Sequence, residues 1–437
     1  MKYSWSAGAL LAAASSVAVH AVTFEAGNYY ADQVQAIAYS NFGTAGSYKK
    51  VTTMSNGVCN FGDQPYSGGL APFDKEISWH FRGPMRLKQF ASYSAGSGPT
   101  KRSLHPSPHE RRHAHQHLHQ HVHEARDGHV EEKRAVGDWV VATINGDVVS
   151  WKNEYAGGAA PAAPTSAPAP AGGAPAPAPA PAPAASYSAS APAPSVNTGA
   201  GTWGRQAYYN SEQGVADGLV FLNNMGGQGS GVFDYTWGNS LSYCAADANS
   251  GSASPVTLAD TFIDDNKEVI IMTDKPCNGD CGTVRDGTVA YHGFDGSSKL
   301  FLVEFSMPLT GKTGFNQDMP AAWILNAEVP RTLQYGSCSC WASGCGEMDV
   351  FEVLNSGNTK AISAWHGLNS KGDSSWFQRP IDKTMKAAIF LDGTSSSVHI
   401  VVLPDSTTFD TSLTDAAITG FINSVSDPKL SVKVSLP

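Results

Sequence analysis

Charged residues are scarce in this sequence. Asp, Glu, Lys and Arg together make up 15% of the 437 residues, and their balance gives a formal net charge of −9. A chain of this sign lacks the basic surface that binds a phosphate backbone, so we expect no nucleic-acid partner. Long stretches with the apolar period of a helix are also lacking. Glycine (44) and proline (26) are abundant instead, which favours an all-β extracellular protein over a helical cytosolic one.

Long apolar runs are missing too. No segment is apolar for long enough to span a membrane, and the last residues, DPKLSVKVSLP, lack the apolar tail of a lipid anchor. The first 21 residues, MKYSWSAGALLAAASSVAVHA, have the pattern of a secretory signal peptide, with Lys2 before a short apolar core and a small-residue cleavage pattern at Ala21. A buried N-terminal helix is the less favoured alternative. We therefore expect a secreted protein without a membrane anchor.

Cysteines are few, but secretion makes disulfides plausible. Cys59 stands alone in the N-terminal part of the chain. The other six can pair in many ways, and the sequence does not choose among them. The cluster CSCWASGC would also suit zinc, although the oxidising compartment favours disulfides. These six are Cys244, Cys277, Cys281, Cys338, Cys340 and Cys345.

Composition divides the chain into segments. Between residues 96 and 134 every second residue from His113 to His123 is histidine, which indicates a disordered insert and, as a weaker alternative, metal capture. The insert ends at Lys133-Arg134, which is either a kexin-type processing site or an accidental basic pair. The predicted order is a signal peptide (1–21), a β-rich unit (22–95), the histidine-rich insert (96–134), a β-hairpin that completes the β-rich unit (135–155), an Ala/Pro-rich linker (156–200) and a catalytic domain (201–437).

Residues 201–437 contain many short apolar stretches separated by Gly, Asp, Asn and Ser. Examples are GLVFLNNM, EVIIMTD, KLFLVEFSMPL, AAIFLDG and SVHIVVLP. Short strands with frequent turn signals predict a β-sandwich.

The segment GCGEMDVFEV places Glu347, Asp349 and Glu352 among apolar residues that look like a buried strand. Side chains alternate along a strand, so Glu347 and Asp349 share a face whereas Glu352 would lie on the other. A one-residue bulge after Asp349 would return Glu352 to the acidic face and leave Val350 and Phe351 to the core or to the bulge.

Such a bulge would bring the two glutamates to within about 5–6 Å, the spacing of retaining glycosidases. These enzymes use one carboxylate as nucleophile and one carboxylic acid as proton donor, and Asp349 could hold the nucleophile between them. A solvated edge strand and a calcium site are the alternatives. Trp323, Trp341 and Trp365 lie nearby in sequence; indole faces stack on sugars, although a single Trp is more often part of a core.

PAAWILNAEVP followed by GEMDVFEV resembles glycoside hydrolase family 16, in which a Trp-bearing strand precedes Glu-x-Asp-x-x-Glu. The glycine-rich segment GLVFLNNMGGQGSG precedes the acids here, whereas a similar motif follows them in that family, which indicates circular permutation. Nearly the whole chain, including LAPFDKEISWHFRGPMRLKQFASY, is similar to the fungal cell-wall circularly permuted 1,3-β-glucanases. The resemblance implies a jelly-roll, concanavalin-like sandwich with a glycan cleft.

The resemblance also implies roles: Glu347 as nucleophile, Asp349 as assisting acid and Glu352 as general acid/base. Substrate contacts are expected from Trp323, Trp341, Trp365 and His366. The implied function is retaining cleavage of internal linkages in cell-wall 1,3-β-glucan by a monomer without metal or other cofactor. A transglycosylase on the same carboxylates and a non-catalytic wall-binding protein are the alternatives.

Overall fold

The computed structural model describes residues 22–96, 139–144, 147–152 and 201–437. These fall into two units, one containing residues 22–96 and 201–437 and the other containing a hairpin of β8 (Trp139–Ile144) and β9 (Asp147–Lys152). A hairpin is thus present where the sequence predicts one, and its completion of the unit that contains residues 22–96 stays a prediction. The signal peptide, the histidine-rich insert, the basic pair and the Ala/Pro-rich linker lie outside the described residues.

Two large sheets form most of the first unit. One, here the acid sheet because it contains Glu347, has the order β16-β15-β12-β17-β6-β19-β20-β21-β22, with β23 paired to β21. Its strands are β16 (Gly251–Ser252), β15 (Ser242–Cys244), β12 (Leu219–Asn223), β17 (Glu268–Thr273), β6 (Ile77–Arg82), β19 (Ala321–Asn326), β20 (Glu347–Glu352), β21 (Lys360–His366), β22 (Lys371–Gly372) and β23 (Phe377–Gln378).

The opposite sheet has the order β11-β10-β7-β18-β24-β25-β3-β27, with β26 paired to β10. Its strands are β11 (Val215–Asp217), β10 (Thr202–Asn210), β7 (Arg86–Ala95), β18 (Lys299–Ser306), β24 (Met385–Asp392), β25 (Ser397–Leu403), β3 (Ala36–Ser40), β27 (Ser431–Ser435) and β26 (Ser412–Thr414).

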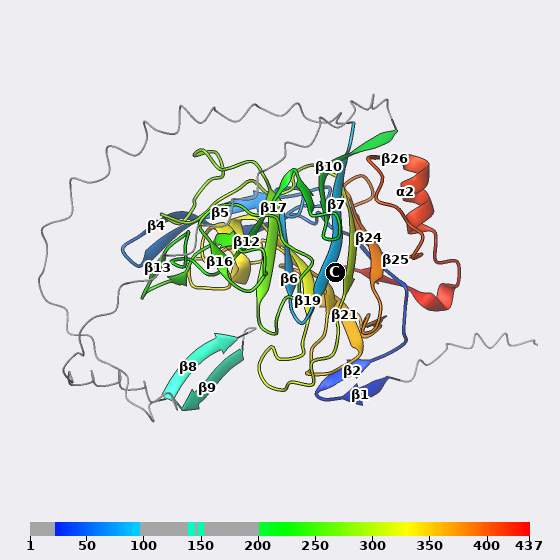
Figure 1. The fold of residues 1–437 in the computed structure, drawn as a ribbon, viewed down its shortest axis with the longest axis horizontal. Coiled ribbons are helices and arrows are strands. Elements are labelled where there is room, and N and C mark those ends of the chain that lie inside the picture. Colours follow the sequence, from blue (N-terminus) through cyan, green and yellow to red (C-terminus); the bar gives the residue numbers. More distant parts are fainter. Residues whose placement is uncertain (1–21, 97–138, 145–146, 153–200) are drawn as a thin grey trace, which may run out of the picture. The chain divides into compact units, whose positions relative to one another are not determined.

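Short hairpins and helices complete this unit. The helix α2 begins after Thr414, whose side chain accepts a hydrogen bond from the Ala417 amide, and it lies beside β24 and β25 in Figure 1. None of the helices in the described ranges is long and apolar enough to cross a membrane. These elements are β1 (Thr23–Glu25), β2 (Asn28–Tyr30), β4 (Gly46–Ser55), β5 (Val58–Tyr66), β13 (Phe233–Asp234), β14 (Gly238–Asn239), α1 (Glu328–Arg331), α2 (Asp415–Ile422) and the 3₁₀ turns η2 (Trp341–Ser343) and η3 (Pro428–Leu430).

One hydrophobic core joins the two sheets. Trp79 of the acid sheet packs edge-on against Phe90 and Phe301 of the opposite sheet, with ring centroids 6.0 and 5.4 Å apart. All three side chains are fully buried. The predicted all-β sandwich is confirmed, whereas the jelly-roll connection stays a prediction.

Residues 22–95 do not form a separate domain, contrary to the prediction. Strand β6 lies between β17 and β19, and β7 lies between β10 and β18. Five of the six residues of β6 are buried, so the strand has no polar face that would let it lie at the surface of a small unit. The N-terminal strand β3 also pairs in parallel with the C-terminal strand β27. The two regions thus share one sandwich.

The expected disulfides are present. They join Cys59 to Cys338, Cys277 to Cys281, and Cys340 to Cys345, and the buried Cys244 is a free thiol. Cys59 is the single cysteine of the N-terminal part of the sequence, and the hairpin β4–β5 brings it to Cys338 in a loop far along the sequence. The cysteines of CSCWASGC are in disulfides rather than in a zinc site.

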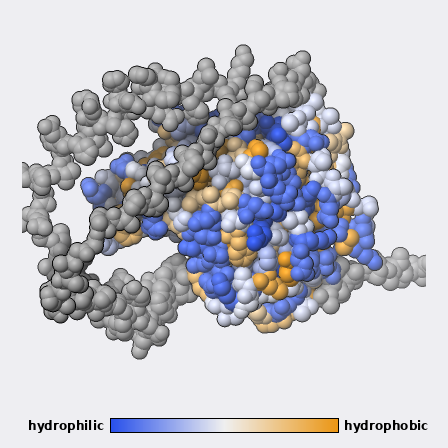
Figure 2. Space-filling model, viewed as in Figure 1, coloured by the Kyte–Doolittle hydropathy of each residue, from blue (hydrophilic) through white to orange (hydrophobic). Residues whose placement is uncertain are grey.

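The face drawn in Figure 2 carries mainly hydrophilic residues, and its hydrophobic residues are in small separate groups. Most apolar side chains of the first unit are accordingly inside the sandwich.

Candidate active site

Strand β20 contains the predicted bulge. On its β19 side Phe351 pairs with Ala322 and Asp349 pairs with Trp323, so Val350 is an extra residue without an opposite neighbour. On its β21 side the pairing also shifts between Asp349 and Glu352. The bulge reverses the alternation of side chains after Asp349.

The bulge sorts acids and apolar residues onto opposite faces. Met348, Val350, Phe351 and Val353 belong to the core between the sheets. Glu347, Asp349 and Glu352 lie on the other face, as predicted; about 6% of Glu347 and Asp349 is exposed, and the Glu352 side chain is 23% exposed.

Two donors hold the carboxylate of Glu347. The Tyr335 hydroxyl donates to Oε1 at 2.6 Å, and the Trp341 indole N–H donates to Oε2. The Tyr335 and Trp341 rings are themselves in edge-to-face contact, with centroids 5.2 Å apart. Tyr335 is 45% exposed. Its backbone is left-handed (φ +57°), a strained conformation for a tyrosine, and this conformation directs the hydroxyl to Glu347.

Asp349 and Glu352 each have a cationic partner. The His366 ring lies 2.8 Å from Asp349 through Nε2, and hydrogen bonding to Asp349 raises the pKa of His366 to about 9. The Arg82 guanidinium donates to Glu352 at 3.3 Å and to the Met319 carbonyl at 3.0 Å. These contacts place His366 in the site, as predicted, and add Arg82, which was not predicted.

Burial raises the pKa of both Glu347 and Glu352, and repulsion by Asp349 raises it further. The pair therefore retains a proton nearer neutral pH than an ordinary carboxyl does. The two donors on Glu347 stabilise its ionised form.

Two of the three predicted tryptophans lie at the acids. Trp341 is half-buried and contacts Glu347. Trp323 lies opposite Asp349, is 5% exposed, and stacks on the His80 ring at 5.2 Å. Its indole N–H is buried and unpaired among the described residues.

The placement of Trp365 in the site is wrong. Its ring is 1% exposed and packs edge-on against Phe42 and Phe73, with centroids 4.9 and 4.8 Å apart. Trp365 directly precedes His366 on β21, and adjacent strand residues point to opposite faces. That alternation was visible in the sequence and excludes one of the two from the cleft.

A fourth carboxylate on the acid sheet, Glu268 of β17, was not predicted. Glu268 lies 2.6 Å from His80 Nδ1, and the Asn224 and Gln334 amides donate to it at 3.2 and 2.9 Å. The other nitrogen of His80 contacts the Ser78 hydroxyl at 2.7 Å. Ser78 and His80 are fully buried, so this Ser-His-Glu chain cannot reach a substrate with its hydroxyl and serves to orient Glu268.

The chain is similar to known cell-wall proteins. A family model described as "Cell wall protein YJL171C/Tos1, C-terminal" matches residues 201–421, and its N-terminal counterpart matches residues 35–95. A protein of Arthroderma benhamiae named "Probable circularly permuted 1,3-beta-glucanase" is 43% identical over 426 residues, or 93% of each chain.

Two further relatives are named "Probable circularly permuted 1,3-beta-glucanase TOS1". The Saccharomyces cerevisiae protein is 42% identical over 91% of each chain, and the Candida albicans protein is 38% identical over 92% of this chain and 93% of that protein. No solved structure matches. Both matched regions lie in the unit that forms the sandwich.

Proposed function

The chain belongs to the cell wall protein YJL171C/Tos1 family, and on this premise we propose that it is a secreted, retaining endo-1,3-β-glucanase of the fungal cell wall. The names of its relatives support a β-glucan substrate. The observation that carries the proposal is the bulge at Val350, because it gathers Glu347, Asp349 and Glu352 on one face.

Glu347 is the proposed nucleophile. Its carboxylate oxygen attacks the anomeric carbon as the bond from that carbon to the glycosidic oxygen breaks, and Glu352 gives its proton to the departing oxygen. Glu352 then takes a proton from water, whose oxygen displaces Glu347 and releases the sugar. Each carboxylate oxygen has two acceptor positions, so the bonds from Tyr335 and Trp341 leave lone pairs for attack.

Asp349 and His366 are proposed to form an ion pair that limits the net negative charge of the site. The His366 cation offsets one of the three carboxylates, which keeps the pKa values of the two glutamates from rising further. Trp323 and Trp341 lie on the same face as the acids and are the proposed sugar contacts, Trp341 through its half-buried ring.

The stereochemistry of the first product tests this proposal. Proton NMR of laminarin cleaved by the purified protein should show the β-anomer before mutarotation, because two inversions give retention. An initial α-anomer would overturn both the nucleophile and the close approach of the two glutamates. Sizing the products of a defined oligosaccharide would separate hydrolysis from transfer, and glucan binding without any cleavage would identify a wall-binding protein.

A further inference from the structure

The hairpin β4–β5 extends from the N-terminal part of the chain and packs against the loop formed by residues 332–346. This loop connects α1 to β20. It contains both donors to Glu347, Tyr335 and Trp341. Cys338 lies between these two residues in the sequence. Gln334, in the same loop, holds Glu268. The loop thus contacts two carboxylates of the acid sheet.

The hairpin is fastened to this loop by a covalent bond. Cys59 of β5 is joined to Cys338, 279 residues further along the sequence. Beside the disulfide, Val51 and Met54 of the hairpin pack with Leu333 of the loop in one hydrophobic cluster. The attachment lies three residues from Tyr335 and three from Trp341, so little chain is left to move independently.

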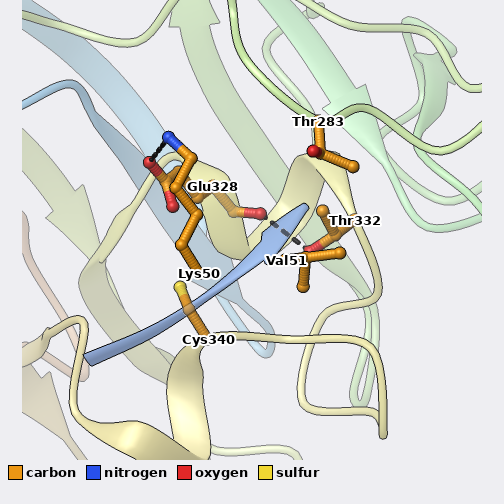
Figure 3. Close-up of a pocket in the computed structure, with 6 residues that line it drawn as sticks. All are labelled: Lys50, Val51, Thr283, Glu328, Thr332 and Cys340. Atoms are coloured by element: carbon orange, nitrogen blue, oxygen red, sulfur yellow. Dashed lines mark hydrogen bonds and ion pairs between the residues drawn. The ribbon is translucent and has the colours of Figure 1, made fainter. Parts of the chain in front are cut away.

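Further contacts fix the first strand of the hairpin. The Lys49 amide donates to the Ser343 hydroxyl at 2.9 Å, and the Lys50 ammonium pairs with Glu328 at 2.7 Å. Tyr48 is buried in a cluster with Trp323, Cys340 and Cys345. Figure 3 shows Lys50 and Val51 beside Glu328, Thr332 and Cys340, where a narrow pocket separates β4 from the loop.

We propose that the hairpin β4–β5 is a positioning element of the active site: through the Cys59–Cys338 disulfide it holds the loop so that Tyr335 and Trp341 donate to the two oxygens of Glu347. The inference rests on the proposed role of Glu347 as nucleophile. It gives the N-terminal region a function in catalysis, although none of its hairpin residues contacts a carboxylate of the bulge. A shift of about 1 Å in a positioned catalytic group is enough to lower a rate about 100-fold.

The test compares the full-length C59S/C338S variant with C277S/C281S, which removes a disulfide that does not include the loop. Laminarin cleavage gives kcat and KM. The indole N–H resonance of Trp341, assigned with Trp341→Phe, reports its hydrogen bond to Glu347 without any need for activity. We expect C59S/C338S to lower kcat about 100-fold, with KM changed much less, and to shift the indole proton upfield. The control should keep wild-type kcat and the wild-type resonance.

Wild-type kcat and an unshifted indole proton in folded C59S/C338S would overturn the inference. Ser343→Ala, which removes the hydroxyl between Lys49 and the loop but keeps the disulfide, decides the case if C59S/C338S does not fold. A partial shift of the same resonance in Ser343→Ala supports the inference, and an unshifted one overturns it. A wild-type protein that cleaves no glucan would defeat the proposed function, whereas the indole resonance would still decide whether the hairpin positions the loop.

Discussion

The two faces of strand β20 have opposite properties. One face presents Glu347, Asp349 and Glu352, and the other presents side chains that are fully buried between the sheets. The bulge formed by one extra residue, Val350, places the acids on one face and the apolar side chains on the other. The comparison shows that three acids can lie in an apolar strand because the bulge keeps all of them out of the core and because neighbouring side chains supply donors and cations.

The apolar face of β20 should matter mainly for stability, and the acidic face mainly for activity. The apolar face contributes hydrophobic burial, whereas the acidic face carries charge in a poorly solvated place, which costs free energy. Substitutions on the two faces should therefore have different consequences, and they can be ranked by size.

The largest effect is expected from the acids. Glu347→Gln should lower glucan cleavage roughly 10⁴-fold or more, because an amide cannot form the glycosyl intermediate. Circular dichroism should show an unchanged fold. Glu212→Gln, at an exposed carboxylate, is the control and should retain full activity. Substantial turnover by purified Glu347→Gln would assign the nucleophile elsewhere.

A large effect of another kind is expected on the apolar face. Phe351 is fully buried and packs against Phe305 and Phe377, with centroids 5.3 and 4.9 Å apart. Phe351→Ala should lower the free energy of unfolding by about 3–5 kcal/mol in urea titrations. Molecules that remain folded should keep most of their activity, and a change in activity without loss of stability would contradict the separation of the faces.

The sequence was sufficient to predict the bulge because three acids and four apolar residues cannot be sorted onto two faces of a regular strand. The resemblance to a family then supplied the roles of the acids. Trp365 could have been excluded by alternation with His366. By contrast, nothing local marks Tyr335, whose contact with Glu347 depends on a left-handed turn.

Long-range pairing explains the other error. The sequence of residues 22–95 predicts strands, and β6 and β7 are strands. Which strands they join depends on contacts with residues more than 100 positions away, such as those of β6 with β17 and β19. The low-complexity segments between the two regions suggested separate domains, but composition does not predict which strands of the chain pair with one another.

A smaller effect is expected from Asp349→Asn, because Asp349 contacts His366 rather than the reacting atoms. The loss of cleavage should be about 100-fold, less than for either glutamate. Loss of the Asp349 carboxylate should also lower the pKa of His366 from about 9 towards the ordinary value, since the hydrogen bond to Asp349 is the main cause of the rise. NMR titration of His366 measures this shift, and Asp405→Asn, at an exposed carboxylate, is a matched control. A loss greater than that of Glu347→Gln would reverse the assigned roles.

The smallest effect is a gain in stability. Burial and then Asp349 raise the pKa of Glu347 from 4.5 to about 8, so the folded protein binds this proton more tightly than the unfolded chain does. Stability contributed by the protonated group is present below pH 4.5 and is lost as the pH rises towards 8. Glu347→Gln does not titrate and cannot lose this stability, so the melting temperature of this variant relative to the wild type should rise by about 2–4 °C between pH 4 and pH 8.

The amide also disturbs the bonds from Tyr335 and Trp341, but that penalty does not depend on Glu347 ionisation and leaves the pH trend intact. Glu212→Gln should show no such trend, and a difference for Glu347→Gln that is constant with pH would mean that Glu347 titrates normally in the folded protein.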